Sequence, residues 1–330
     1  MYYLINSTVI SIFFIFLIHI SLFNFNLKYY FIKSDNSLRW SDKKAFLIGG
    51  FIFIVFFIYN YLISYFGFNN SLLNIYDLFF LIIFYLIGLY DDKYNINGKI
   101  KILFYFIYIF FICSFYVNYL DLFSLIVLSF VLFGIFISLN IIDNMDGVFP
   151  LFFLYVLIFI SSLLSINNNI IIIYSLFPVI LVSLYFLIIN LFYGKNYLGD
   201  SGSYLLSGLM IITFLKYGDK FITSFEIIQY VSLLIICFAY SIYDIIYVCI
   251  KRIQAGKSPL DGGLDHSSHK LSRIFNSDLK AIFFLGFINL IYFLINFYLI
   301  LFNFFYLYNI FIMCLYFAIL TIIMIKPSSK

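Results

Sequence analysis

The segment NIIDNMDG, Asn140 to Gly147, places two carboxylates and two amides directly after the apolar run 122–139. Asp143 and Asp146 are three residues apart, so they would share one face if the preceding helix continues. Gly147 permits a sharp exit from such a helix. Taken alone, the segment is equally compatible with a polar turn and with a binding or catalytic site.

A pair of adjacent carboxylates, Asp91 and Asp92, ends another apolar run. Two such close carboxylates do not both stay ionised at low cost without a cation between or beside them. One of them can therefore face a metal or a phosphate while the other faces a basic partner, of which Lys93 is the nearest in the chain. The alternative is a solvated helix end.

A loop of small residues, Gly199 to Ser203, opens a further apolar segment. Its backbone N–H groups and the start of a helix can approach an anion, while Asp200 offers oxygen to a hard cation. The loop is not a Walker A motif, because no GK[ST] follows it. A simple Gly/Ser turn into a membrane helix is the alternative.

Histidines and buried charge mark the last polar segment. His266 and His269 have no further Cys or His nearby that would complete a zinc site. With Lys270 and Arg273 beside them, they suit a phosphate-rich ligand better. Asp244 lies inside an apolar run, where a carboxylate is costly, so it is a functional candidate as well.

The elements that position these residues are membrane spans. With 65% hydrophobic and 10% charged residues among 330, the chain needs the lipid bilayer as its solvent. We predict one all-α polytopic domain, 1–330, and no nucleic-acid partner. The apolar runs predict about 11 transmembrane helices, near 3–25, 46–65, 72–90, 102–119, 122–139, 149–164, 170–192, 204–215, 227–250, 281–301 and 304–325.

Basic residues predict the orientation of these spans. Of the 19 Lys and Arg residues, only Lys216 and Lys220 fall on the side opposite to the others. The positive-inside rule then places the N-terminus outside and the C-terminus in the cytoplasm. All four polar segments open on the cytoplasmic face in this topology, which predicts one shared site at the inner membrane surface.

In this order, the segments resemble the polyprenyl-phosphate N-acetylhexosamine-1-phosphate transferases, of the glycosyltransferase family 4 type. Members carry a DD pair after the third span, NxxDxxDG after the fifth, a GDSGS-like loop before the eighth, an SIYD-like Asp in the ninth and a His loop before the tenth. The matching residues here are Asp91 and Asp92; Asn140, Asp143, Asp146 and Gly147; Gly199 to Gly202; Asp244; and Asp265 to Leu271.

The sequence also departs from the family pattern. Asn144 stands where the family often has Gly, and Asp42 where many members have His. Ala45 and Leu47 replace the usual prolines of the first loop, and Ser268 stands where many relatives have a third histidine. Without the triple-His signature of the peptidoglycan branch, the resemblance favours the branch that starts O-antigen, teichoic-acid or capsule chains.

The resemblance implies transfer of a sugar-1-phosphate from a UDP-N-acetylhexosamine, most often UDP-N-acetylglucosamine, to undecaprenyl phosphate in the bacterial cytoplasmic membrane, with release of UMP. Mg²⁺, or Mn²⁺, would be the cofactor, because two polyanions must meet and carboxylates are the ligands on offer. The expected catalytic residues are Asp91, Asp92, Asp143 and Asp146; the expected substrate-binding residues are Asn140, Asp244, His266, His269, Lys270 and Arg273; and Asp200 is the expected metal ligand.

Two other classes stay open. A transporter would also place acids in spans, although its sites usually lie near the midplane in interrupted helices and repeated halves. A structural or assembly subunit would not need the carboxylates. Only the enzyme would release UMP from a UDP-sugar in the presence of a lipid phosphate.

Overall fold

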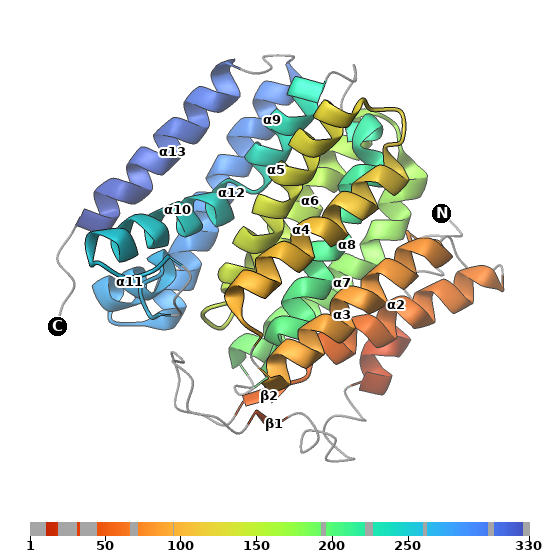
Figure 1. The fold of residues 1–330 in the computed structure, drawn as a ribbon, viewed down its shortest axis with the longest axis horizontal. Coiled ribbons are helices and arrows are strands. Elements are labelled where there is room, and N and C mark those ends of the chain that lie inside the picture. The colour runs from red at the N-terminus through yellow and green to blue at the C-terminus, as the bar shows by residue number, and fades with distance from the viewer. Residues whose placement is uncertain are drawn as a thin grey trace.

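The computed structural model describes residues 11–18, 32–33, 45–66, 72–94, 96–192, 196–221, 227–259, 263–302 and 307–325. These residues form a helical bundle with a small sheet at one end (Figure 1). The elements are β1 (Ile32–Lys33), β2 (Ala45–Leu47), α2 (Gly49–Tyr65), α3 (Ile75–Tyr94), α4 (Gly98–Tyr116), α5 (Leu122–Ile141), α6 (Val148–Ile166), α7 (Ile170–Phe192), β3 (Asn196–Tyr197), α8 (Gly199–Phe221), α9 (Ile227–Cys237), α10 (Ala239–Gln254), α11 (Ser267–Phe275), α12 (Asp278–Leu301) and α13 (Leu307–Ile325).

Membrane-spanning helices dominate this bundle. In the described part of the chain, six helices are long and apolar enough to cross a bilayer: α4, α5, α6, α7, α12 and residues Tyr308–Ile325 of α13. A bent pair, α9 with α10, brings the number to seven if it counts as one span. The helical, polytopic membrane class is therefore confirmed, while the number of eleven spans and their orientation stay predictions.

The predicted first span, 3–25, falls largely outside the described residues, and only residues 11–18 of it are seen as helix. Asp42, one of the departures from the family pattern, also lies outside them.

Helix α8 forms the centre of the bundle, where we expected only a short span at 204–215. It runs for 23 residues and contacts α2, α3, α4, α5 and α6. Every residue from Ser201 to Leu215 is buried. Because protein rather than lipid surrounds α8, it can carry the serines and glycines that make it look too polar for a span. Such small residues also let neighbouring backbones approach closely.

The predicted ninth span, 227–250, is wrong as one continuous helix. The chain breaks at Phe238, and α10 leaves the direction of α9 at 73°. Helix α10 is amphipathic, with Asp244 and Arg252 buried against the protein and Ile246 and Ile250 exposed. A helix with one polar and one apolar side fits an interfacial position better than a transmembrane one. Asp244 therefore lies beyond the break rather than inside a straight span.

The small sheet brings two distant segments together at one end of the bundle. Strand β2 pairs antiparallel with β1 and parallel with β3, with Phe46 opposite Asn196. The N–H of Gly50, at the start of α2, donates to the carbonyl of Leu198 at 3.2 Å. The first residues of α2 and α8 are thus held side by side near β2 (Figure 1).

At the opposite end of the bundle, a buried ion pair joins α3 to α8. Lys216 Nζ donates to Asp77 Oδ2 at 2.7 Å and to the carbonyl of Leu72 at 3.0 Å. Tyr116 of α4 donates its hydroxyl to the same carboxylate. Asp77 is fully buried, so this polar cluster compensates its charge and ties three helices at one level.

Candidate functional site

The side chain of Asp92, at the end of α3, caps the start of α8. Its Oδ1 accepts the backbone N–H of Asp200, and its Oδ2 accepts the N–H of Ser201, each at 3.0 Å. The first N–H groups of a helix have no partner inside it, and its dipole favours a negative charge there. The two N–H groups that we expected to face a phosphate are therefore taken by a carboxylate of the protein.

Two glycines make this contact possible. A Cβ at Gly88 would lie 2.4 Å from the Cα of Ser201, so only glycine lets α3 and α8 approach this closely. Gly199 has φ +73°, and a Cβ there would lie 2.9 Å from Oδ2 of Asp92. The positive φ and the close carboxylate both favour glycine at this position.

Asp91 points to a different set of partners and is fully buried. Its Oδ1 accepts the N–H of Ile96 at 2.8 Å, and its Oδ2 accepts the hydroxyl of Tyr204 at 2.6 Å. The ammonium group of Lys101, on α4, forms an ion pair with the same carboxylate. One acid of the pair thus has a basic partner, but this partner is Lys101 rather than Lys93. That the other acid faces a metal or a phosphate stays a prediction.

The segment Asn140–Gly147 is a turn and not a helical continuation. Helix α5 ends at Ile141, and Gly147 adopts φ +83° before α6 begins. Ser203 of α8 donates its hydroxyl to Asn140 Oδ1 at 2.6 Å, which holds the start of the turn against α8. The N–H of Gly147 donates to Asn190 Oδ1 at 2.5 Å, which holds its end against α7.

Carboxylates gather around this turn. Burial raises the pKa of Asp143 well above its usual range, and the negative charges of Asp200, Asp146 and Asp92 raise it further. Like charges shift a pKa in this way only when they lie close together. Acids from α3, from the turn and from the start of α8 therefore share one electrostatic environment, as the sequence predicted.

The segment before α11 forms a second polar cluster with α10. Asp244 is fully buried, and its Oδ2 lies 2.8 Å from Nδ1 of His266. Its Oδ1 accepts the backbone N–H of Ser267 at 2.8 Å. A carboxylate on Nδ1 fixes the orientation of an imidazole and directs its Nε2 edge away. Asp244 thus fixes the direction of His266.

A bidentate ion pair braces the same segment. Arg252 Nε and Nη2 donate to the two carboxylate oxygens of Asp265, each at 2.8 Å. The hydrogen bond from Arg252 lowers the pKa of Asp265. Because Asp265 directly precedes His266, this pair fixes the backbone that carries the histidine.

His269 is buried and neutral. Its Nε2 lies 3.1 Å from the carbonyl of Asn144, so this nitrogen carries the proton and donates. Burial, together with the neighbouring His266, lowers the pKa of His269 to about 4. Arg273 donates to the carbonyl of Leu264 at 2.9 Å, and Lys270 is half-buried on α11.

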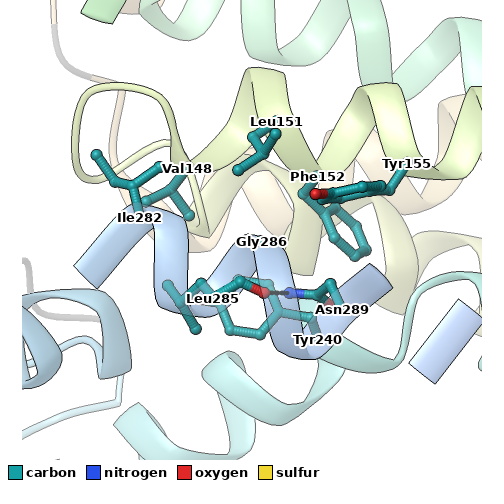
Figure 2. A pocket seen from close by; sticks show the side chains of 9 residues that line it. All are labelled: Val148, Leu151, Phe152, Tyr155, Tyr240, Ile282, Leu285, Gly286 and Asn289. Atoms are coloured by element: carbon teal, nitrogen blue, oxygen red, sulfur yellow. Dashed lines mark hydrogen bonds between the residues drawn. The ribbon is translucent and has the colours of Figure 1, made fainter. Parts of the chain in front are cut away.

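A separate small cavity lies between α6 and α12 and beside Tyr240 of α10 (Figure 2). It encloses about 10 Å³, room for about one water, and none of the candidate acids or histidines lines it. Asn289 contributes its amide, which donates to the carbonyl of Leu285 at 2.8 Å. The cavity is therefore not part of the carboxylate site.

The acids fit a hard, oxygen-bound cation in their chemistry. In the described part of the chain, no group of three or more His, Cys, Asp or Glu side chains is arranged to hold a metal by itself. Mg²⁺ commonly uses one or two carboxylates and completes its shell with phosphate oxygens and water. The close negative charges around Asp143, with Asp200 among them, are those that such a cation would neutralise.

Several residues of this network were not singled out from the sequence. Lys101, Tyr204 and Ser203 contact the predicted acids and amides directly, and Asn190 holds the end of the turn. The spacing of Lys101 and Tyr204 after Asp91 follows no local pattern. The one signal in the sequence was the position of Lys101, which follows the DD pair closely enough to turn back to Asp91.

Several of the segments that form this site match a known protein family. Residues 74–218 match the model of glycosyl transferase family 4, and the matched segment includes the DD pair, the Asn140–Gly147 turn and the start of α8. A comparison with curated proteins gives no match. This match to the central part of the chain confirms the resemblance seen in the motifs. The matched family indicates a sugar-phosphate transferase, and the apolar helices indicate a multi-pass membrane protein.

Proposed function

We propose that the protein transfers an N-acetylhexosamine-1-phosphate from a UDP-sugar to undecaprenyl phosphate and releases UMP. The observation that carries this proposal is the hydrogen-bond network joining four segments at one end of the bundle. Asp92 binds the start of α8, Ser203 binds Asn140, and Asn144 binds Ser268. Acids and histidines far apart in the sequence therefore meet where a lipid phosphate and a soluble nucleotide sugar can meet.

In the reaction, an oxygen of the acceptor phosphate attacks the donor phosphorus that bears the sugar. The bond from this phosphorus to the UMP oxygen breaks, and a lipid-linked diphosphate sugar forms. Asp92 is 8% exposed and Asp91 is fully buried, so we assign Asp92 to the acceptor and Asp91 to the support of the site. Asp92 acts as the base that takes the acceptor proton or as a nucleophile in a two-step route.

The donor is placed between the turn and the His segment. His266, oriented by Asp244, presents its Nε2 edge to the diphosphate or the uridine. Lys270 and Arg273 add positive charge beside it, and Asn140, Asp143 and Asp146 line the opposite side. His269, which is neutral, contributes hydrogen bonding and shape rather than charge.

Mg²⁺, or Mn²⁺, would be held by Asp200, with Asp143 and Asp146 in its surroundings. When bound, such a cation would supply positive charge that stabilises the departing UMP. The protein's own part is to fix Asp200 through the helix start that Asp92 caps.

The setting follows from the topology predicted above. We place the site on the cytoplasmic face of a bacterial inner membrane, where UDP-sugars are available. The product would start a lipid-linked cell-surface polysaccharide outside the peptidoglycan pathway. UDP-N-acetylglucosamine is our first choice of donor.

The test is UMP release by the purified protein in detergent or nanodiscs. Undecaprenyl phosphate is supplied with each of several UDP-N-acetylhexosamines, and UMP and the lipid product are both measured. We expect UMP and lipid-linked sugar in equal amounts with at least one donor. If no donor gives either product, and the protein instead moves a solute across vesicles, the transporter reading replaces this one.

A further inference from the structure

Asn144 lies in the turn between the candidate acids Asp143 and Asp146, and it forms hydrogen bonds with two residues of α11. Its side-chain Oδ1 accepts the hydroxyl of Ser268 at 2.5 Å, and its backbone carbonyl accepts Nε2 of His269 at 3.1 Å. Consecutive residues of α11 therefore bind the same turn residue by two separate acceptors. We propose that Asn144 and Ser268 form a latch that positions the His segment against the carboxylate turn for binding of the sugar nucleotide.

The geometry of the latch is fixed on both sides. The Nδ2 of Asn144 donates to the carbonyl of Ile141 at 3.1 Å, so both ends of the amide are oriented. Ser268 is fully buried and His269 is 1% exposed. A buried hydroxyl without its acceptor would lose a hydrogen bond that water cannot replace. The latch therefore holds one arrangement of the two segments.

The latch connects the two halves of the site. Asn144 belongs to the turn that carries Asp143 and Asp146. On the other side, Ser268 follows His266 and Ser267, which Asp244 holds on α10. The contacts of Asn144 with Ser268 and His269 therefore link the turn that carries the acids directly to the segment that carries the histidines.

This role deepens the proposed function and rests on it. A sugar nucleotide that spans the turn and the His segment needs the two at a fixed separation, and binding is weakened when the protein must first order them. Asp92, where we place the acceptor phosphate, is held by the start of α8. Loss of the latch should therefore weaken binding of the donor and leave binding of the acceptor unchanged.

The test uses the full-length protein with Asn144→Ala, Ser268→Ala and the double substitution. Asn144→Ala keeps the backbone carbonyl that His269 binds. We expect each single substitution to raise the donor KM about tenfold, with kcat and the acceptor KM within about twofold of the unmodified protein. The double variant should show about the same tenfold change, because both substitutions remove one shared interaction.

Ser161→Ala is the matched control, since the Ser161 hydroxyl donates to the carbonyl of Leu157 in its own helix. It should leave all kinetic parameters unchanged. Amide hydrogen exchange of α11 is measured in parallel and should be faster in both latch variants than in the control.

Normal donor KM in both single variants would overturn the proposal. A hundredfold change in the double variant would also overturn it, because the two residues would then act independently. A fall in kcat with a normal donor KM would show that the latch does not act through binding of the donor. If the unmodified protein releases no UMP with any donor, the proposed function fails, and the latch is judged by exchange alone: faster exchange in α11 retains it, and unchanged exchange refutes it.

Discussion

Asp92 and Ser201 are 109 residues apart in the chain, yet the N–H of Ser201 donates to Oδ2 of Asp92 at 3.0 Å. The carboxylate at the end of α3 thus caps the start of α8. Its negative charge is stabilised by two helix N–H groups and by the dipole of α8. The acid that we assign to the acceptor is therefore built into the packing of the two helices.

Replacement of the two adjacent acids separates their roles. Asp92→Asn should lower kcat for UMP release by at least about 100-fold, because the group that faces the acceptor loses its charge. Asp91→Asn should instead lower thermal stability more strongly, because Lys101 and Tyr204 lose a buried charged partner. Near-normal turnover in Asp92→Asn with none in folded Asp91→Asn would exchange the two assignments.

The close approach of α3 and α8 can be tested by replacing glycines with alanine. Gly88→Ala places a Cβ against the backbone of Ser201 and should cost about 1–3 kcal/mol of stability. Gly134→Ala on α5 meets nothing within 4 Å and should be neutral. Thermal unfolding in detergent compares the two. Equal melting temperatures for both variants would show that the contact at Gly88 is not tight in the protein.

The ion pair at the far end of the bundle should matter for stability but not for chemistry. Lys216→Met leaves Asp77 buried without its cation and should cost about 3 kcal/mol. Addition of Asp77→Asn should recover part of this loss. The turnover per folded molecule should stay normal in both variants. A selective fall in turnover, with unchanged unfolding, would contradict this structural role.

Metal dependence tests the acids around the turn. EDTA should abolish UMP release, and Mg²⁺ or Mn²⁺ should restore it. Asp200→Asn should stay inactive at saturating Mg²⁺, whereas the control substitution Ser161→Ala should respond as the unmodified protein does. Normal metal dependence in an active Asp200→Asn variant would move the ligand role to Asp91 and Asp92.

The buried histidine predicts an acid-sensitive fold. Burial lowers the pKa of His269 from its ordinary value of 6.5 to about 4 in the folded protein. The unfolded chain therefore binds a proton on His269 in this interval while the folded protein does not, so stability falls as the pH drops from about 6.5 to about 4. The loss reaches about 3 kcal/mol at most. His269→Gln should flatten this part of the profile of melting temperature against pH.

The sequence predicted that these polar segments come together, because their acids and histidines stand out against an apolar chain, and the hydrogen bonds between them confirm this. It did not predict their contacts. Lys101 reaches Asp91 through the turn between α3 and α4, and Asn144 reaches Ser268 across 124 residues. Both residues of the latch were departures from the family pattern, and only the fold shows that they bind each other.

The errors in the fold have local causes. The break at Phe238 falls inside an apolar run without Pro or Gly, so hydropathy alone continues the span. The turn after Ile141, which the sequence left open against a helical continuation, depends on Asn190 and Ser203 in other helices. The length of α8 was underestimated because Asp200 and Lys216 lie near its two ends; in the fold, Asp77 compensates the charge of Lys216.

Helices α3 and α8 run antiparallel and are fastened at both ends, by Asp92 at one and by Asp77 with Lys216 at the other. A pair pinned at two points cannot slide by one turn without breaking both sets of bonds. In the proposed reaction, the substrate must nevertheless enter and UMP must leave. Any movement that admits them has to leave the α3–α8 pair intact, and the bend at Phe238 gives α10 and α11 a pivot that this pair lacks.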